Sequence, residues 1–391
     1  MRTYSSALII NGPKQKNDHL TSMRQEDNMG DQYPRFKAAA VQASPVFLNR
    51  DATVDKACQL IQEAGRNGAK LVAFPETFIP GYPYWIWLDS PLKHDELFVR
   101  LFEESVEIPG PATDALCRAA KAADTYVVMG INEKVPTNMG TMWNTNLIID
   151  RQGNILGKHR KLVPTFAEKM IWSRGDGSGI RVWKTDIGNL GTLACGENSN
   201  TLARYALLAM GEQIHVANYP SIGLGSKLGQ NTWIQVRAGA HSLEGKLFTV
   251  VSTSSINREM VDMLGVTDEK RRFMTNASPF SAIYGPNAEV LASIEGEDGI
   301  IYADIDIELE IARKQWHDII GHYNRFDVLS VNLNTDADQP IRFLSSQPHG
   351  PDSESATDDA MAKLLEQTQA DQRELRKAID TISRRLDGEG K

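Results

Sequence analysis

The chain has 391 residues, of which 41% are hydrophobic and 24% charged, and its formal net charge is -8 at pH 7. This length and apolar content suffice for one large core or two modest ones. Nucleic-acid-binding proteins usually carry a basic excess, so the acidic balance argues against a nucleic-acid partner. The apolar runs are too short for a signal-peptide core or a membrane span, so we expect no membrane contact.

The chain has three cysteines, Cys58, Cys117 and Cys195, which lie far apart in the sequence. Their number is odd, and no C-x-x-C pair or Cys/His ligand spacing occurs. The pattern therefore supports neither a disulfide framework nor a zinc site. A reducing compartment fits it best, which predicts a cytoplasmic protein.

Residues 1–34 are polar and lack a hydrophobic period, which predicts a flexible N-terminal tail. Ordered structure is expected to begin at FKAAAVQAS, an apolar run typical of a buried strand. In the following DATVDKACQLIQEAGRNG, apolar residues recur at helical spacing. The next apolar run, KLVAFPE, predicts a second strand that Pro75 interrupts.

The alternation of strands and helices continues up to residue 306. PATDALCRAAKAAD predicts a helix and TYVVMGINE a strand, while NTNLIIDRQGNILGKHRK and FSAIYGPNAEVLASIE each predict a hairpin. IRVWKTDIGNLGTLAC predicts another hairpin, with its turn near Gly188 and Asn189. EQIHVANYP and GKLFTVVSTSS predict strands on either side of a helix near residues 229–244, and GIIYADID predicts the last strand. This mixture indicates a layered α/β domain with mixed sheets.

A cysteine stands at the junction of a strand and a helix in GTLACGENSN, where Cys195 is followed by a helical segment that begins near Asn198 or Ser199. The positive end of a helix dipole would lower the pKa of a thiol there and favour a nucleophilic thiolate. The N–H of Gly196, which has no side chain to block approach, could hold a developing negative charge. A buried structural thiol explains this stretch alone equally well.

Two further stretches carry candidate catalytic groups. Glu76 in LVAFPETF follows a strand and lies among aromatic residues, where a dry environment would raise its pKa and suit a general base. In GKHRKLVPTFAE, Lys161 ends a strand and Glu168 follows it. The plain alternatives are a strand-end glutamate bonded to the backbone and a solvated basic cluster at His159, Arg160 and Lys161.

Together, FPETF, HRKLVPTFAE and CGENSN resemble the signature blocks of the nitrilase superfamily of carbon–nitrogen hydrolases, in the same order and with similar separation. The resemblance extends from about Phe36 to about Ser330, and GHYNRFDVLSVNLN resembles a segment of the nitrilase branch. Three blocks in order are more specific than a single short motif.

The resemblance implies an α-β-β-α sandwich over residues 35–345, which dimerises and often extends into larger homo-oligomers or spirals. It implies hydrolysis of an organic nitrile to the carboxylic acid and ammonia, through a thioimidate and an acyl-thioester, without metal or organic cofactor. By matched position it implies four catalytic residues, namely Cys195 as nucleophile, Glu76 as general base, Lys161 as the stabilising cation and Glu168 as the group that orients Lys161 and the leaving nitrogen. The two carboxylates are expected to keep Lys161 charged.

Substrate-binding residues are harder to assign. Many nitrilases carry tryptophan where this chain has Gly196, and Phe326 stands where many relatives have proline. The candidates that we expect to border the substrate are Gly196, Tyr82, Trp172, Tyr219, Pro220 and His322, although most of the aromatic residues suit a core or a subunit interface as well. The sequence does not distinguish aliphatic, aromatic and arylacetonitrile substrates.

Three other functions remain open at this point. An amidase or N-carbamoyl amidohydrolase of the same superfamily would use the same residues on an amide. A Cys/His hydrolase would use His159, His215 or His322 as base, but nothing around Cys195 resembles a protease motif. A non-catalytic assembly protein is disfavoured because all four candidate catalytic residues are present.

Residues 346–391 form a separate C-terminal segment. SQPHGPDSESAT is polar and predicts a flexible linker, and the residues after it carry apolar side chains at heptad spacing with two polar interruptions. The spacing predicts an amphipathic helix that pairs with a neighbouring subunit, and a disordered charged tail is the alternative.

We expect deletion of all residues after Gly350 to reduce the mass of the assembly measured by light scattering, because it removes the apolar seam of this helix. An unchanged mass, with no loss of helical circular dichroism, would show that the heptad spacing is accidental.

Overall fold

The computed structural model describes residues 31–90, 93–223, 229–265, 267–276, 278–339 and 341. The predicted N-terminal tail, up to residue 30, and the predicted linker and helix of residues 346–391 lie outside these ranges. The compact unit discussed below ends at Ala337. Within the described residues, no helix is both long and apolar enough to cross a membrane.

Two mixed sheets of six strands form the centre of this unit. The strand order of the first sheet is β12 (Gly299–Asp306), β1 (Arg35–Gln42), β2 (Ala69–Ala73), β3 (Tyr126–Lys134), β4 (Met142–Ile149) and β5 (Ile155–Arg160). The order of the second is β11 (Val290–Glu295), β10 (Phe280–Tyr284), β9 (Phe248–Thr253), β8 (Ile214–Tyr219), β7 (Gly188–Ala194) and β6 (Trp183–Thr185). Strands β1, β2 and β3 are parallel, as are β7, β8 and β9, and the outer strands are antiparallel.

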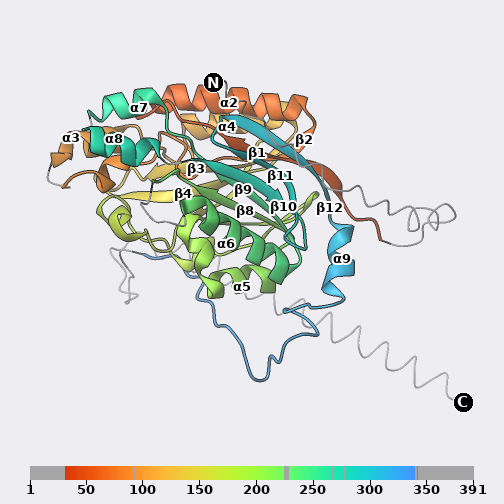
Figure 1. Ribbon diagram of the computed structural model, residues 1–391. Coiled ribbons are helices and arrows are strands. Elements are labelled where there is room, and N and C mark those ends of the chain that lie inside the picture. The colour runs from red at the N-terminus through yellow and green to blue at the C-terminus, as the bar shows by residue number, and fades with distance from the viewer. Residues whose placement is uncertain are drawn as a thin grey trace, which may run out of the picture. The chain divides into compact units, whose positions relative to one another are not determined.

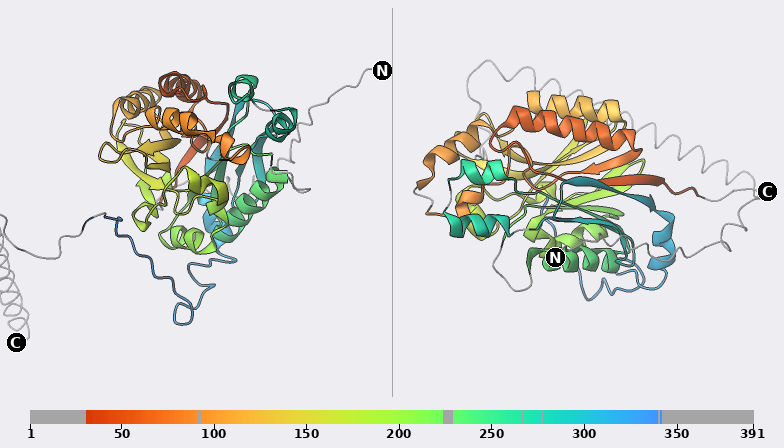
Figure 2. Two further views of the ribbon diagram at one scale, coloured as in Figure 1. Left: turned by 90° about the vertical axis from the view of Figure 1, so that its left-hand side faces the viewer. Right: turned by 45° about the horizontal axis from the view of Figure 1, so that its top comes forward.

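Helices cover the outer face of each sheet. Figure 1 shows α2 (Arg50–Arg66) and α4 (Pro111–Ala123) on one side of the paired sheets, and α5 (Thr201–Ala209) and α6 (Gly229–Gly245) on the other. The same layers appear in the right-hand view of Figure 2. The described shorter elements are α3 (Asp95–Glu103), α7 (Arg258–Met263), α8 (Asp268–Thr275), α9 (Glu308–Lys314), η1 (Tyr84–Trp87), η3 (Phe166–Met170), η4 (Gly177–Gly179) and η5 (Cys195–Ser199). The expected α-β-β-α sandwich is confirmed.

Strand β1 shows why the sequence gives this layering. Successive side chains of a strand point to opposite faces of the sheet. Ala39 and Val41 pack with residues of α2 and α4, whereas Ala38 and Ala40 pack in the core between the two sheets. A strand that is buried on both faces is expected to be mostly apolar on both, as the run AAAV is.

The predicted strands and the four long helices are confirmed, with one local error. The turn of the β6–β7 hairpin lies at Asp186 and Ile187, and Gly188 is already the first residue of β7. The hydroxyl of Thr185 donates to the Gly188 carbonyl and accepts the Ile187 N–H, which fixes the turn before the glycine. The helices α3, α7, α8 and α9 were not predicted.

A glycine in β3 sets the path of the loop that follows β2. Phe74 N–H donates to Val128 O at 2.9 Å, and Ile79 N–H donates to Gly130 O at 3.2 Å. The loop between them therefore crosses β3 at Gly130. A Cβ atom on Gly130 would lie only 2.1 Å from Pro75 O and 2.6 Å from Thr77 N. The residue between Pro75 and Thr77 is Glu76.

We expect Gly130→Ala to push the Glu76 loop outward, because backbone atoms cannot yield to a contact of this length. Overpacking of this kind costs about 1–3 kcal/mol of folding free energy, and a shift of about 1 Å at a catalytic group costs about 10²-fold in rate. Thermal unfolding and turnover measure the two effects. The matched control is Gly239→Ala, whose Cβ would meet Ala288 at an ordinary 3.6 Å. Equal rates for the two variants would contradict the prediction.

Candidate active site

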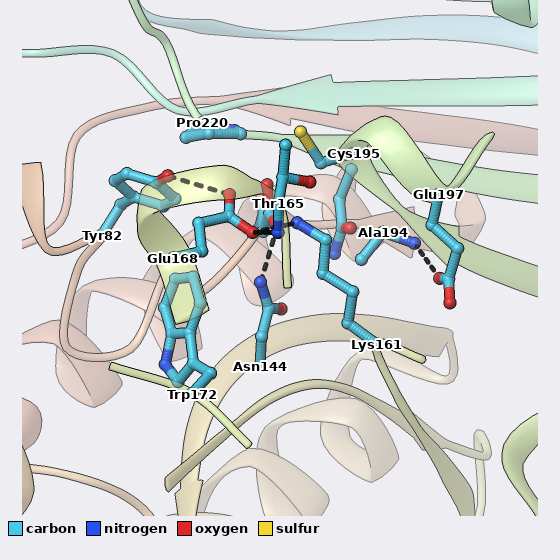
Figure 3. Close-up of polar contacts among 12 residues, drawn as sticks. Tyr82, Asn144, Lys161, Thr165, Glu168, Trp172, Ala194, Cys195, Glu197 and Pro220 are labelled. Atoms are coloured by element: carbon cyan, nitrogen blue, oxygen red, sulfur yellow. Dashed lines mark hydrogen bonds and ion pairs between the residues drawn. The ribbon is translucent and has the colours of Figure 1, made fainter. Parts of the chain in front are cut away.

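Three strand ends bring the candidate catalytic residues together. Glu76 follows β2, Lys161 follows β5, and Cys195 follows β7 of the other sheet. One side-chain atom of each of Glu76, Glu168 and Cys195 lies within 4.8 Å of the other two. Figure 3 shows Lys161, Glu168 and Cys195 converging on one space from different elements. All four residues that the motif blocks single out are thus neighbours.

The ammonium group of Lys161 lies between two carboxylates. Its Nζ donates to Glu76 Oε1 at 2.9 Å and to Glu168 Oε2 at 2.6 Å, and all three side chains are buried. Burial alone would lower the pKa of Lys161, but Glu76, Cys195 and Glu168 outweigh it and raise that pKa well above its ordinary value. The two carboxylates therefore favour the charged form of Lys161, and because its side chain is buried the residue is not part of a solvated basic cluster.

Glu76 has one occupied and one open oxygen. Oε1 accepts from Lys161 and, at 2.6 Å, from Asn144 Nδ2 of β4. Oε2 is buried and has no hydrogen-bond partner among the described residues. Burial raises the pKa of Glu76 to about 7, a rise that Glu168 reinforces and that Lys161 and Asn144 oppose. A carboxyl group with this pKa and an open oxygen can take up and release a proton near neutrality.

Glu168 is held from three sides. It lies on η3, where its Oε2 accepts the Thr165 N–H at 2.7 Å as well as Lys161. Its Oε1 accepts the Tyr82 hydroxyl at 2.8 Å, and that hydroxyl accepts Trp87 Nε1 at 3.0 Å. These bonds fix the carboxylate, so Glu168 is suited to orienting Lys161.

Cys195 is the first residue of η5 and has φ = 49°, in the left-handed region that few non-glycine residues adopt. Its side chain is partly exposed. Burial and Glu76, opposed by Lys161, raise the pKa of Cys195 well above its ordinary value. The expectation of a pKa lowered by a helix dipole is therefore wrong. Helix α5 begins only at Thr201, and the carboxylates of Glu76 and Glu168 disfavour the thiolate. The resting thiol needs a base before it can attack.

The remaining predicted residues lie in different surroundings. A Cβ atom on Gly196 would come within 3.2 Å of Thr165 Oγ1, so the turn and η3 approach each other closely here. Trp172 is buried, contacts Tyr82 edge-on at 5.5 Å and donates to Asn132 Oδ1 at 2.7 Å.

Tyr219 and Pro220 lie at the end of β8. The Tyr219 side chain is buried in the core beneath Cys195, and Pro220 lies beside Cys195 in Figure 3. His322 is exposed, on the stretch whose Asn324 donates to the hydroxyl of Tyr205 on α5. Its role in substrate binding stays a prediction.

Two groups of side chains in the described part of the chain combine potential metal ligands. They are Glu76–Glu168–Cys195 and Glu212–His215–His241. In the second group, both Glu212 oxygens already accept from the two histidines, at 2.7 and 2.8 Å. In the first group, Lys161 lies between the carboxylates of Glu76 and Glu168 and forms an ion pair with each. Hydrogen bonds within the second group, and ion pairs to Lys161 in the first, thus engage these side chains without a metal.

Several functional contacts were not predicted from the sequence. Asn144 is one: a polar residue at the start of the apolar run NTNLIID was a usable signal, because buried strands seldom contain asparagine. The others are the Thr165 N–H and the side chains of Glu197, Asn198 and His159. His159 is completely buried, which excludes the solvated basic cluster.

Comparison with known proteins agrees with this geometry. The carbon–nitrogen hydrolase family profile matches residues 37–315. The chain belongs to this family. It is 40% identical over 320 residues to an aliphatic nitrilase of Rhodococcus rhodochrous, covering 80% of this chain and 87% of the relative. It is also 40% identical over 317 residues to a nitrilase of Bacillus sp. (strain OxB-1), covering 80% and 92%. These matches place the chain in the nitrilase branch of the superfamily.

Solved structures of the superfamily share the fold. A carbon–nitrogen hydrolase of Helicobacter pylori gives a TM-score of 0.60 at 21% identity, over 75% of this chain and 96% of that one. Nit3 of Saccharomyces cerevisiae gives a TM-score of 0.59 at 19% identity, over 72% and 94%. The sandwich is therefore common to family members whose sequences have diverged widely.

Proposed function

We propose that the protein is a nitrilase that converts an organic nitrile into the carboxylic acid and ammonia. The observation that carries the proposal is the arrangement of a thiol, an open carboxylate oxygen and a shared ammonium within one small buried site. The curated relatives that share 37–40% identity over about 80% of the chain and are named nitrilases support the choice of nitriles over amides.

In the first step, Cys195 attacks the nitrile carbon. Glu76 Oε2 takes the thiol proton, a C–S bond forms, and the proton passes to the nitrile nitrogen to give a thioimidate. Charge develops on that nitrogen as the bond forms. Lys161, held by Glu76 and Glu168, supplies positive charge beside it, and one such donor typically contributes about 10²–10³ in rate.

In the second step, water adds to the thioimidate carbon and ammonia leaves, so that an acyl-thioester remains on Cys195. Glu76 then removes a proton from a second water, which attacks the acyl carbon and releases the carboxylic acid and the thiol. Two waters are consumed and one ammonia is formed for each nitrile. A base with pKa about 7 suits a group that must accept and return protons in every turn.

We further propose that the protein works as a homodimer or a larger homo-oligomer in the cytoplasm. Exposed apolar side chains on the outer helices α5 and α6 and at the end of α5, namely Leu202, Val236, Leu243 and Met210, supply a surface for association. The three cysteines are free thiols, which suits a reducing compartment.

A panel of aliphatic, aromatic and arylacetonitriles, each paired with its amide, tests the reaction. We expect ammonia and acid from at least one nitrile, at a rate above that of the matched amide. Mass spectrometry during turnover should show an acyl or thioimidate adduct on Cys195, and Cys195→Ala should lose all turnover while keeping its thermal unfolding temperature. Turnover of amides alone, or an adduct on Cys58 or Cys117, would contradict the proposal.

The pH dependence tests Glu76. Only the ionised carboxylate accepts the thiol proton, so kcat/KM should rise with pH through about 7 and fall about tenfold per unit below it. Asn144 stabilises the ionised form by its hydrogen bond. Asn144→Ala should therefore raise the pKa of Glu76 and move this limb to higher pH. A limb that stays in place in the variant would show that another group controls it.

A further inference from the structure

Two neighbouring side chains of η5 hold the backbone on either side of Cys195. Glu197 Oε2 accepts the N–H of Ala194 at 3.0 Å, a contact drawn in Figure 3. Asn198 Nδ2 donates to the carbonyl oxygens of Leu193 at 3.1 Å and of Cys195 at 3.0 Å. Both side chains are buried. Side chains therefore form hydrogen bonds with backbone groups of Leu193, Ala194 and Cys195.

Glu197 also reaches the other sheet. Its Oε1 accepts the N–H of Leu162 at 2.8 Å, and Leu162 directly follows Lys161 at the end of β5. Ala194, which Oε2 holds, directly precedes Cys195 at the end of β7. One carboxylate thus joins the residue after Lys161 to the residue before Cys195.

A buried histidine supports Glu197. His159 Nε2 lies 2.8 Å from Glu197 Oε2, and His159 Nδ1 lies 3.1 Å from Gly179 O. Since both partners are acceptors, both ring nitrogens carry hydrogen and the ring is a cation. Burial would lower the pKa of His159, but Glu197 outweighs it and raises that pKa. A Cβ atom on Gly179 would lie 3.0 Å from His159 Nδ1, so the ring fits closely against this glycine.

A second histidine supports Asn198 in the same way. His215 Nε2 lies 2.7 Å from Asn198 Oδ1, and His215 Nδ1 lies 2.7 Å from Glu212 Oε1. A Cβ atom on Gly191 would come within 1.9 Å of that same oxygen, so a glycine again makes the room. Asn198 and Glu197 are therefore each fixed from behind by a completely buried ring.

The backbone that these contacts hold is strained. Cys195 has φ = 49°, a left-handed conformation in which Cβ crowds the backbone and which few non-glycine residues adopt. Strain of this kind persists only where the surroundings over-determine it.

We propose that Glu197 and Asn198 hold the strained backbone turn at Cys195 and fix the position of the thiol relative to Lys161. His159 and His215 hold these two side chains in place by hydrogen bonds. We call the four residues the clamp. The inference rests on the proposed function, because it concerns the groups that carry that chemistry. None of the four is a catalytic residue; they act through Cys195 and Lys161 as positioning residues.

Glu197→Gln tests the clamp with almost no change in shape. An amide has one oxygen, so one of the three groups that now donate to Glu197 would face an NH₂ group instead. We expect kcat to fall about 10²-fold, as for a displacement of about 1 Å, with KM within about threefold of wild type. Alkylation of Cys195 by iodoacetamide, followed by mass spectrometry, should slow at least tenfold.

The matched control is Glu133→Gln. Glu133 is also a buried carboxylate with ion pairs to β5, through Lys158 and Arg160, but it lies on the strand face opposite to His159. It should lose a similar amount of thermal stability and keep kcat within about threefold. Asn198→Ala removes the hydrogen bonds of Asn198 to the Cys195 turn and should lower kcat at least tenfold. This variant tests the clamp if Glu197→Gln gives no folded protein.

Unchanged kcat and alkylation in folded Glu197→Gln or Asn198→Ala would overturn the clamp, as would losses no larger than those of Glu133→Gln. Because alkylation needs no nitrile, a wild type that fails on every nitrile would contradict the proposed function and leave the clamp measurable.

Discussion

The ion pairs between Lys161 and the carboxylates of Glu76 and Glu168 are the interaction on which the site depends. Two carboxylates so close together in a buried space repel each other, and each loses its hydration. The shared ammonium makes their proximity possible. Removal of one partner from a buried ion pair typically costs about 3–5 kcal/mol, because it leaves an uncompensated charge. The three residues are therefore a single electrostatic unit, and a change in the charge of one alters the environment of the other two.

The sandwich fold supplies this unit with its precision. Lys161 and Cys195 directly follow the last residues of β5 and β7, and Glu76 lies three residues beyond the end of β2. Glycines then allow neighbouring segments to approach: Gly130 receives the Glu76 loop, and Gly196 allows the Cys195 turn to approach Thr165. The strand ends fix where each side chain starts and which way it points. The close approaches at the glycines bring the side chains near one another.

The layers follow from local signals in the sequence, whereas the four central residues were assigned by matched position in three motif blocks, because each stretch alone also had a plain structural explanation. An apolar run with a polar residue at its end predicts a buried strand with a functional group at its edge, as for Glu76 and Cys195. The pKa of Cys195 was predicted wrongly, since it depends on burial and on the carboxylates of Glu76 and Glu168, which reach the thiol only in the folded chain, and not on the adjacent helix. Glu197 and Asn198 were not assigned because Glu197, which follows β7, has partners at β5 of the other sheet, and His215, a partner of Asn198, lies on the neighbouring strand β8.

The charges of the buried unit also affect substrate entry and product release. Once Glu76 is ionised, Lys161 balances only one of two negative charges, so the site carries a net negative potential. An uncharged nitrile enters such a site without electrostatic penalty. The carboxylate product is an anion, and it meets Glu76 and Glu168 at close range in a medium where charge repulsion is strong. In the proposed reaction, the carboxylates of Glu76 and Glu168 that surround Lys161 therefore also repel the carboxylate product, which favours its release.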